Sequence, residues 1–89
     1  MITRDVTVTN RAGLHTRPAS MIVRTAAQFD SEFFIQKDGY EINGKSIIGV
    51  MTLAAEQGSK LTLILDGADE EQAFGAISQL FDNGFGEVK

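Results

Sequence analysis

Strand and helix patterns alternate along the chain in an order that leaves few folds open. Residues 2–9 (ITRDVTVT) alternate apolar and polar side chains, as a half-buried strand does, and residues 31–37 and 60–66 form two further strand patterns. The Asp-Gly pair at 38–39 is a two-residue hairpin signal, after which residues 40–43 return as a short strand. The strand at 60–66 is the most apolar of the four, which predicts a central place in the sheet.

Helix signals separate these strands. A helix is predicted after His15, with Pro18 in its first turn and apolar residues at helical spacing behind it. Ser46 can cap a short helix over residues 47–54, and Asp69, followed three residues later by Gln72, resembles a capping box that opens a last helix. The order βαββαβα predicts an α+β fold class: an open-faced β-sandwich whose four-stranded antiparallel sheet carries three helices on one face.

The chain has no cysteine among its 89 residues, so one apolar core must hold the fold without disulfides. A zinc ribbon and a thiol nucleophile are excluded on the same ground. We expect residues 1–89 to form a single domain. A chain of this size buries roughly 60–65% of its unfolded surface, too little for a deep enclosed cleft, so a reacting group is expected on the surface.

Charge is distributed unevenly. The net charge of −4 argues against a nucleic-acid partner, yet residues 6–29 contain three arginines and no carboxylate. No apolar run approaches the ~18 residues of a membrane span, and residues 1–8 lack the apolar region of a signal peptide. We therefore expect a cytoplasmic protein without membrane insertion, and at this size a monomer.

The stretch NRAGLHTRPAS (10–20) contains the only histidine and the only proline. His15 precedes a helix, whose first backbone N–H groups and positive dipole end form a ready anion site. Gly13 permits a close backbone approach, and the Arg17 guanidinium is a planar fork suited to phosphate oxygens. These features together describe a site that can hold a phosphoryl group.

Other chemistries fit His15 less well. No metal is expected, because the chain has no second histidine and no cysteine, and nearby carboxylates are missing. A catalytic triad is also disfavoured, since Ser20 is close in sequence but no acid within residues 6–29 could orient the ring. The chain lacks the GxxxxGK[ST] loop needed to take a phosphoryl group from ATP, which favours a carrier over a catalyst.

Two motifs identify the chain with a known family. GLHTRPAS at residues 13–20 and GKSIIGVM at residues 44–51 resemble HPr, the small phosphocarrier of the bacterial phosphoenolpyruvate:sugar phosphotransferase system. The resemblance implies that phospho-enzyme I phosphorylates His15 at Nδ1 and that His15 donates to enzyme IIA domains. It also implies that Arg17 steadies the phosphoryl group and that neither a cofactor nor autonomous catalysis is needed.

The second motif predicts a docking surface beside the histidine. A short helix cannot bury all of the apolar residues after Ser46, so some should form an exposed patch suited to a partner. The resemblance places Ile47, Ile48 and Met51 in this patch. The partner-binding residues predicted in all are Thr16, Arg17, Ser20, Arg24, Ile47, Ile48 and Met51.

Ser46 is a candidate regulatory site as well as a helix cap. In some members of the family a dedicated kinase, HPr kinase/phosphorylase, phosphorylates this serine and a transcriptional regulator reads the signal. Other members carry the same serine without the kinase, and the motif does not separate the two cases. Two further alternatives stay open: a regulatory, nitrogen-type phosphotransferase paralogue, and a small enzyme with a general-base histidine.

Overall fold

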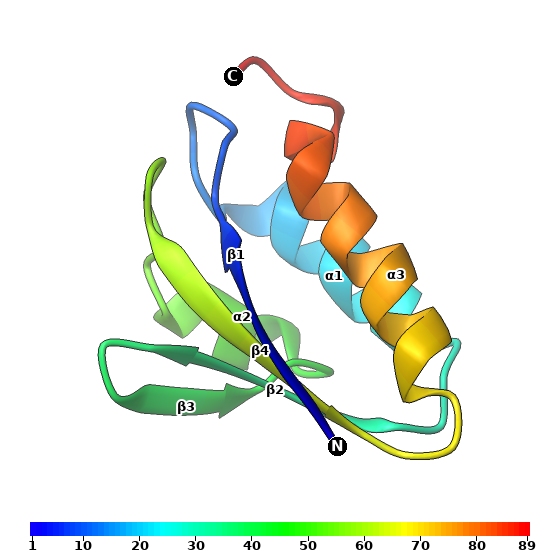
Figure 1. Ribbon diagram of the computed structural model, residues 1–89. Coiled ribbons are helices and arrows are strands. Elements are labelled where there is room, and N and C mark those ends of the chain that lie inside the picture. Colours follow the sequence, from blue (N-terminus) through cyan, green and yellow to red (C-terminus); the bar gives the residue numbers. More distant parts are fainter.

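In the computed structural model, which describes residues 1–89, four strands form one antiparallel sheet in the order β1-β4-β2-β3 (Figure 1). The sheet carries three α-helices, so the predicted open-faced sandwich is confirmed. None of the helices is long and apolar enough to cross a bilayer. The elements in chain order are β1 (Ile2–Thr7), α1 (Thr16–Ala26), β2 (Glu32–Lys37), β3 (Tyr40–Asn43), α2 (Ile47–Thr52), β4 (Lys60–Asp66), α3 (Glu70–Asp82) and a 3-10 turn at Gly84–Gly86.

The sheet is organised around β4. This strand pairs with β1 on one side and β2 on the other, as its apolar sequence predicts. The hairpin between β2 and β3 turns at Asp38 and Gly39, which both adopt left-handed backbone angles with φ of 52° and 80°. Such angles at both central residues are typical of the hairpin turn that an Asp-Gly pair favours.

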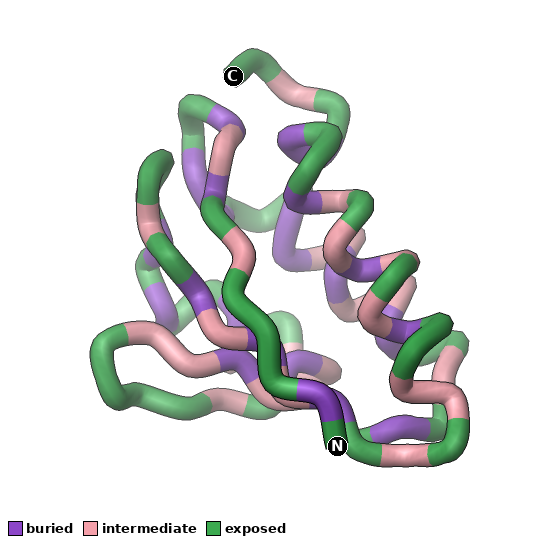
Figure 2. Tube along the Cα trace, in the orientation of Figure 1, coloured by how far each residue is buried: buried purple, intermediate pink, exposed green.

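The core lies between the sheet and the two long helices. Leu61, Leu63 and Leu65 alternate along β4 on its buried face, and α1 and α3 contribute buried apolar residues from their facing sides (Figure 2). Helix α2 packs against α1 and β3 rather than across the middle of the sheet. Helix α2 therefore lies beside α1, and the C-terminal segment lies beside the loop that precedes α1 (Figure 1).

Two predicted details differ in the structure. Helix α2 ends at Thr52, two residues early, because Ala54 has a left-handed φ of 50° that a helix cannot contain. The capping box at Asp69 does not form. Its carboxylate instead accepts hydrogen bonds from the Asp30 and Ser31 backbone amides, at 2.8 and 3.0 Å, and from the Ser31 hydroxyl. Tertiary packing therefore uses this side chain to tie the start of α3 to the segment before β2.

Replacing Asp69 by Asn should destabilise the fold near neutral pH but not at low pH. The hydrogen bonds from the Ser31 hydroxyl and the Asp30 amide lower the pKa of Asp69 below its ordinary value. A carboxylate whose pKa is depressed by folding contributes stability above its unfolded pKa and loses that contribution as pH falls through its folded pKa. Urea unfolding should therefore show a deficit for Asp69→Asn that shrinks from about pH 4 downward.

Asp82→Asn is the matched control, because the Asp82 side chain accepts no hydrogen bond in the structure. It should show no comparable deficit at neutral pH. An Asp69→Asn deficit that stayed constant into the acid range would contradict the assigned role of the carboxylate.

Candidate functional site

His15 lies at the N-cap position of α1, in extended backbone conformation, and its side chain makes no capping hydrogen bond. The helix begins at the next residue, so the ring projects from the positive end of the helix. The side chain is 44% exposed. His15 is thus accessible from outside, as the absence of a deep cleft in so small a chain requires.

Gly13 determines the path of the backbone just before this helix. Its φ is +74°, and a Cβ atom at this position would lie 2.5 Å from the carbonyl oxygen of Ala55. The next residue, Leu14, is buried and donates its backbone N–H to the same oxygen at 2.9 Å. Both the left-handed angle and the close approach require glycine, which confirms the interpretation of Gly13 made from the sequence.

The first turn of α1 presents free hydrogen-bond donors. The backbone N–H groups of Thr16 and Arg17 have no acceptor in the structure, and Pro18 has no N–H to leave unpaired. With the helix dipole, two unpaired amides beside an exposed imidazole form a site suited to an anion. The sequence-based expectation of a phosphate-binding helix start therefore has a defined geometry.

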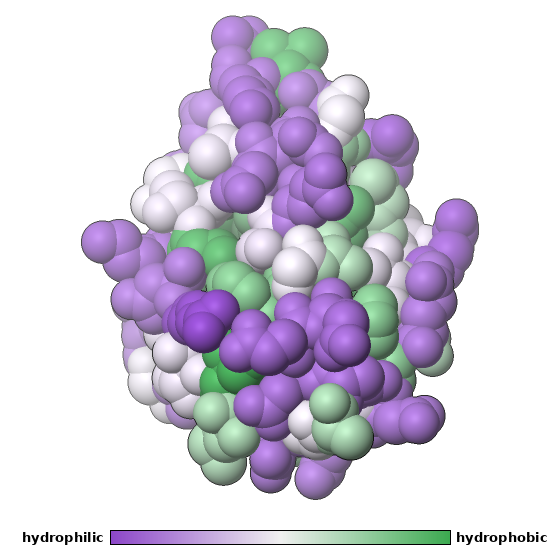
Figure 3. All heavy atoms as spheres, turned by 45° about the vertical axis from the view of Figure 1, so that its right-hand side comes forward, coloured by the Kyte–Doolittle hydropathy of each residue, from purple (hydrophilic) through white to green (hydrophobic).

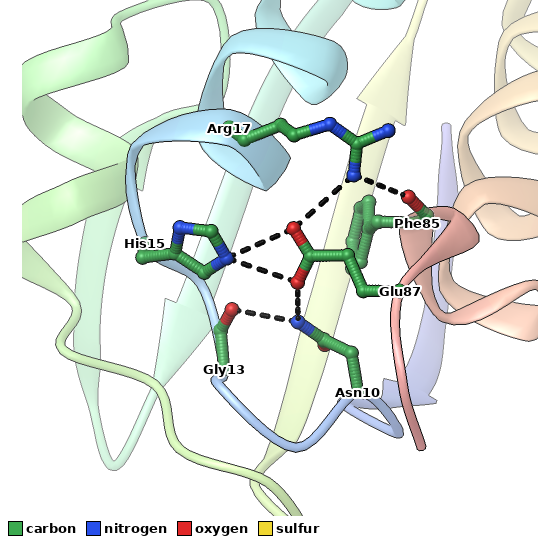
Figure 4. A network of polar contacts seen from close by, with 6 residues as sticks. All are labelled: Asn10, Gly13, His15, Arg17, Phe85 and Glu87. Atoms are coloured by element: carbon green, nitrogen blue, oxygen red, sulfur yellow. Dashed lines mark hydrogen bonds and ion pairs between the residues drawn. The ribbon is translucent and has the colours of Figure 1, made fainter.

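Glu87, in the segment that follows α3, completes the site from the far end of the chain (Figure 4). His15 Nε2 lies 2.9 Å from each carboxylate oxygen of Glu87. The same carboxylate accepts from Arg17 Nη1 at 3.1 Å and from Asn10 Nδ2 at 3.0 Å. Residues 6–29 contain no acid, as the sequence analysis noted, but the fold supplies a carboxylate to the ring from outside that stretch.

The contact with Glu87 determines which ring nitrogen of His15 carries the hydrogen. An ionised carboxylate only accepts hydrogen bonds, so Nε2 must donate. The hydrogen bond from His15 lowers the pKa of Glu87 below its ordinary value, and those from Asn10 and Arg17 act in the same direction against the effect of partial burial. In the neutral ring, Nδ1 then carries the free lone pair, and it points away from Glu87 (Figure 4).

Arg17 is tied to the C-terminal segment rather than to the ring. Its Nη1 donates to the Phe85 carbonyl oxygen at 2.9 Å as well as to Glu87. Its Nε and Nη2 groups make no hydrogen bond in the structure. Arg17 also lines a shallow surface depression together with the other polar residues predicted for the site. The residues that line this depression are His15, Thr16, Arg17, Ser20, Met21 and Arg24.

The predicted apolar patch lies on α2. Ile47, Ile48 and Met51 are 38%, 72% and 41% exposed, whereas Val50 of the same helix is fully buried. The face that Figure 3 brings forward, on the side of α3, shows mainly hydrophilic side chains with small separate apolar areas. Three exposed apolar side chains within five residues therefore mark α2 as the place where apolar surface is concentrated.

Ser46 caps α2, as the sequence predicts. Its hydroxyl oxygen accepts a hydrogen bond from the Gly49 backbone N–H at 3.1 Å. The structure contains no cluster of three or more His, Cys, Asp or Glu side chains that could hold a metal ion.

Sequence patterns alone did not point to Asn10 and Glu87. Glu87 lies 72 residues from His15, and a lone carboxylate in an acidic C-terminal half has no distinguishing local signal. The only hint is Gly84-Phe85-Gly86, where an aromatic residue between two glycines suggests a turn anchored in the core.

Comparison with known proteins decides the family. The family model described as "PTS HPr component phosphorylation site" matches residues 2–83. The phosphocarrier protein HPr of Treponema pallidum is 48% identical over 98% of this chain and 99% of its own length. The chain belongs to the HPr family of phosphocarrier proteins.

The structures of other HPr proteins agree. The crystal structure of HPr-C-His from Thermoanaerobacter tengcongensis matches with a TM-score of 0.95 at 39% identity, and the match covers both chains completely. The HPr-like protein Crh of Halalkalibacterium halodurans is 47% identical over 86% of this chain and 92% of its own length. The match to the HPr family model ends before the segment 84–89, which carries Glu87.

Proposed function

We propose that this HPr-family chain carries a phosphoryl group on His15, accepting it from phospho-enzyme I and donating it to enzyme IIA domains. The observation that carries the proposal is the exposed His15 side chain, whose Nδ1 makes no hydrogen bond, at the start of α1, where two backbone amides are unpaired. A group at such a surface can be reached by a donor and then by an acceptor. The chain acts as a carrier and not as an autonomous catalyst.

Arg17 is proposed to stabilise the transferred group. Its Nε and Nη2 groups can donate to phosphoryl oxygens while Nη1 stays bonded to Phe85 and Glu87. The anchored side chain loses less conformational freedom on binding than a free arginine would. Arg24 is farther from His15 in sequence than Arg17 is, and it donates only to the Ser20 hydroxyl, at 3.3 Å. Its proposed role is therefore to attract acidic partners.

The apolar patch of Ile47, Ile48 and Met51 is proposed as the docking surface for both enzyme I and enzyme IIA. Helix α2 packs against α1, so this patch lies on the element next to the one that carries His15. Thr16, Ser20 and the two arginines form its polar border. A flexible methionine suits a surface that must accept more than one partner.

Ser46 is proposed as a regulatory phosphorylation site for HPr kinase/phosphorylase, with a transcriptional regulator as the reader. A phosphate there would add about −1.5 to −2 charges beside the patch and weaken acidic partners. A nitrogen-type regulatory paralogue is the alternative, and failure of His15 to donate to any sugar-specific enzyme IIA would favour it.

Incubation with enzyme I and labelled phosphoenolpyruvate tests the carrier function directly. The chain should acquire one acid-labile, base-stable label, and His15→Ala should acquire none. Transfer of that label to an enzyme IIA domain completes the test. If the wild-type chain remained unlabelled, or if His15→Ala were labelled equally, the proposal would be wrong.

The same assay compares the two arginines. A charge-assisted hydrogen bond contributes about 1.5–3 kcal/mol, so Arg17→Ala should slow transfer roughly 10- to 150-fold. Arg24→Ala removes the same charge without touching the group and should cost much less. Equal losses in the two variants would contradict direct contact between Arg17 and the phosphoryl group.

Met51→Glu should slow transfer from enzyme I roughly tenfold or more, because it places a charge in the docking surface. Gln79→Glu is the control, since it adds the same charge at an exposed position of α3. Both variants should keep the circular dichroism spectrum of the wild type. A rate for Met51→Glu equal to that of Gln79→Glu would refute the patch as a docking surface.

A further inference from the structure

The C-terminal segment after α3 is built to reach His15. Gly84, Phe85 and Gly86 all have left-handed φ angles, of 58°, 57° and 72°, and such an angle is costly for phenylalanine. The Phe85 side chain is fully buried and packs edge-to-face on Phe81, with ring centroids 5.0 Å apart. Burial of this ring holds the turn that directs Glu87, two residues later, toward the start of α1.

Further contacts fix the two residues that follow Glu87. The Arg11 backbone N–H donates to the Val88 carbonyl oxygen at 2.7 Å, and the Lys89 ammonium donates to the Asp82 carbonyl oxygen at 2.7 Å. The segment therefore lies along the loop before α1 (Figure 1). Its position does not depend on the His15 contact alone.

A buried amide holds the Glu87 carboxylate in turn. Asn10 is completely buried, and its Nδ2 donates both to the Gly13 carbonyl oxygen at 2.8 Å and to Glu87 Oε1. Its side-chain oxygen Oδ1 has no hydrogen-bond partner. A buried polar atom without a partner is destabilising, so this side chain is not explained by stability alone. It fits a residue retained to orient a carboxylate.

From this geometry we infer that Glu87 is a positioning residue for phosphoryl transfer, holding the His15 ring through Nε2–H so that Nδ1 is the nucleophile and offsetting the charge that the ring gains. The inference rests on the proposed function of His15. It assigns to the C-terminal segment a part in the site that no local motif indicates.

The transfer step shows why a carboxylate is useful there. The Nδ1 lone pair forms the new bond to phosphorus while the bond from phosphorus to the donor's leaving atom breaks, and the leaving group takes that electron pair. The ring keeps its Nε2 hydrogen and so becomes positively charged. A carboxylate 2.9 Å from Nε2 stabilises this cation, as the aspartate does in serine protease triads.

Two opposing effects of the Glu87 charge must be weighed. The carboxylate favours the ring cation through a direct hydrogen bond, but its charge also repels an incoming phosphoryl group. Arg17 bonds to the same carboxylate at 3.1 Å and offsets that repulsion, and the phosphoryl group would sit on the opposite side of the ring (Figure 4). The direct contact should therefore dominate.

The ring tautomer provides a readout that a purely structural role would not change. In nitrogen-15 spectra of the full chain, recorded where the ring is neutral, the wild type should show hydrogen on Nε2 alone. Glu87→Ala should move the ring toward the tautomer mixture of a free histidine. Glu87→Gln keeps a carbonyl oxygen that can accept from Nε2–H, so it should restore most of the wild-type tautomer.

Chemical phosphorylation by phosphoramidate measures the ring without any partner protein. The phosphoramidate zwitterion releases ammonia as Nδ1 bonds to phosphorus, so the protein need not supply a proton. Loss of an orienting group commonly costs 10- to 100-fold, and we expect a loss of about that size for Glu87→Ala and a smaller one for Glu87→Gln. Glu71→Ala, which removes an exposed carboxylate from α3, should react like the wild type.

The outcomes separate this inference from the proposed function. If Glu87→Ala kept both the wild-type tautomer and the wild-type phosphoramidate rate, the positioning role would be refuted even if enzyme I labelled His15. If the tautomer and rate changed as expected but enzyme I did not label the wild type, the positioning role would stand and the carrier proposal would fail. Amide spectra of each variant verify that the fold is intact.

Discussion

Packing of two helices on the leucine face of β4 determines where every functional side chain lies. Leu61, Leu63 and Leu65 are almost completely buried, and each such side chain contributes about 1.5–3 kcal/mol. Helices α1 and α3 lie on this face side by side, in contact with each other. The end of α3 therefore meets the start of α1, and residues more than seventy positions apart share one site. Substitutions in this layer would disturb the site without touching it.

The site combines an anion-binding helix start with a carboxylate on the far side of the ring. At the helix start, free amides and Arg17 favour negative charge, whereas Glu87 on Nε2 favours positive charge on the imidazole. These preferences do not conflict, because they act on opposite edges of one ring (Figure 4). A phosphohistidine needs both: acceptors for its ring hydrogen and donors for its phosphoryl oxygens. An exposed position further allows two partners to use the same group in turn.

Local patterns predicted the parts of the fold that local physics determines. Side-chain alternation and the Asp38-Gly39 turn indicated the strands, and Ser46 was correctly predicted as a cap because its partner, Gly49, is three residues away. Asp69 and Glu87 show the limit of this reasoning. Both carboxylates bond to residues 38 or more positions away, and no periodicity or motif reports such pairs. The sequence thus indicated the histidine and the arginine but not the carboxylate that orients them.

The nitrogen that carries phosphorus in the phosphorylated chain is the most direct test of this account. Nitrogen-15 labelled protein, phosphorylated by enzyme I and phosphoenolpyruvate, would show coupling between phosphorus and one ring nitrogen of His15. The structure predicts that coupling at Nδ1, with hydrogen retained on Nε2 beside Glu87. Coupling at Nε2 would mean that the carboxylate must leave before transfer, and it would contradict the arrangement described above.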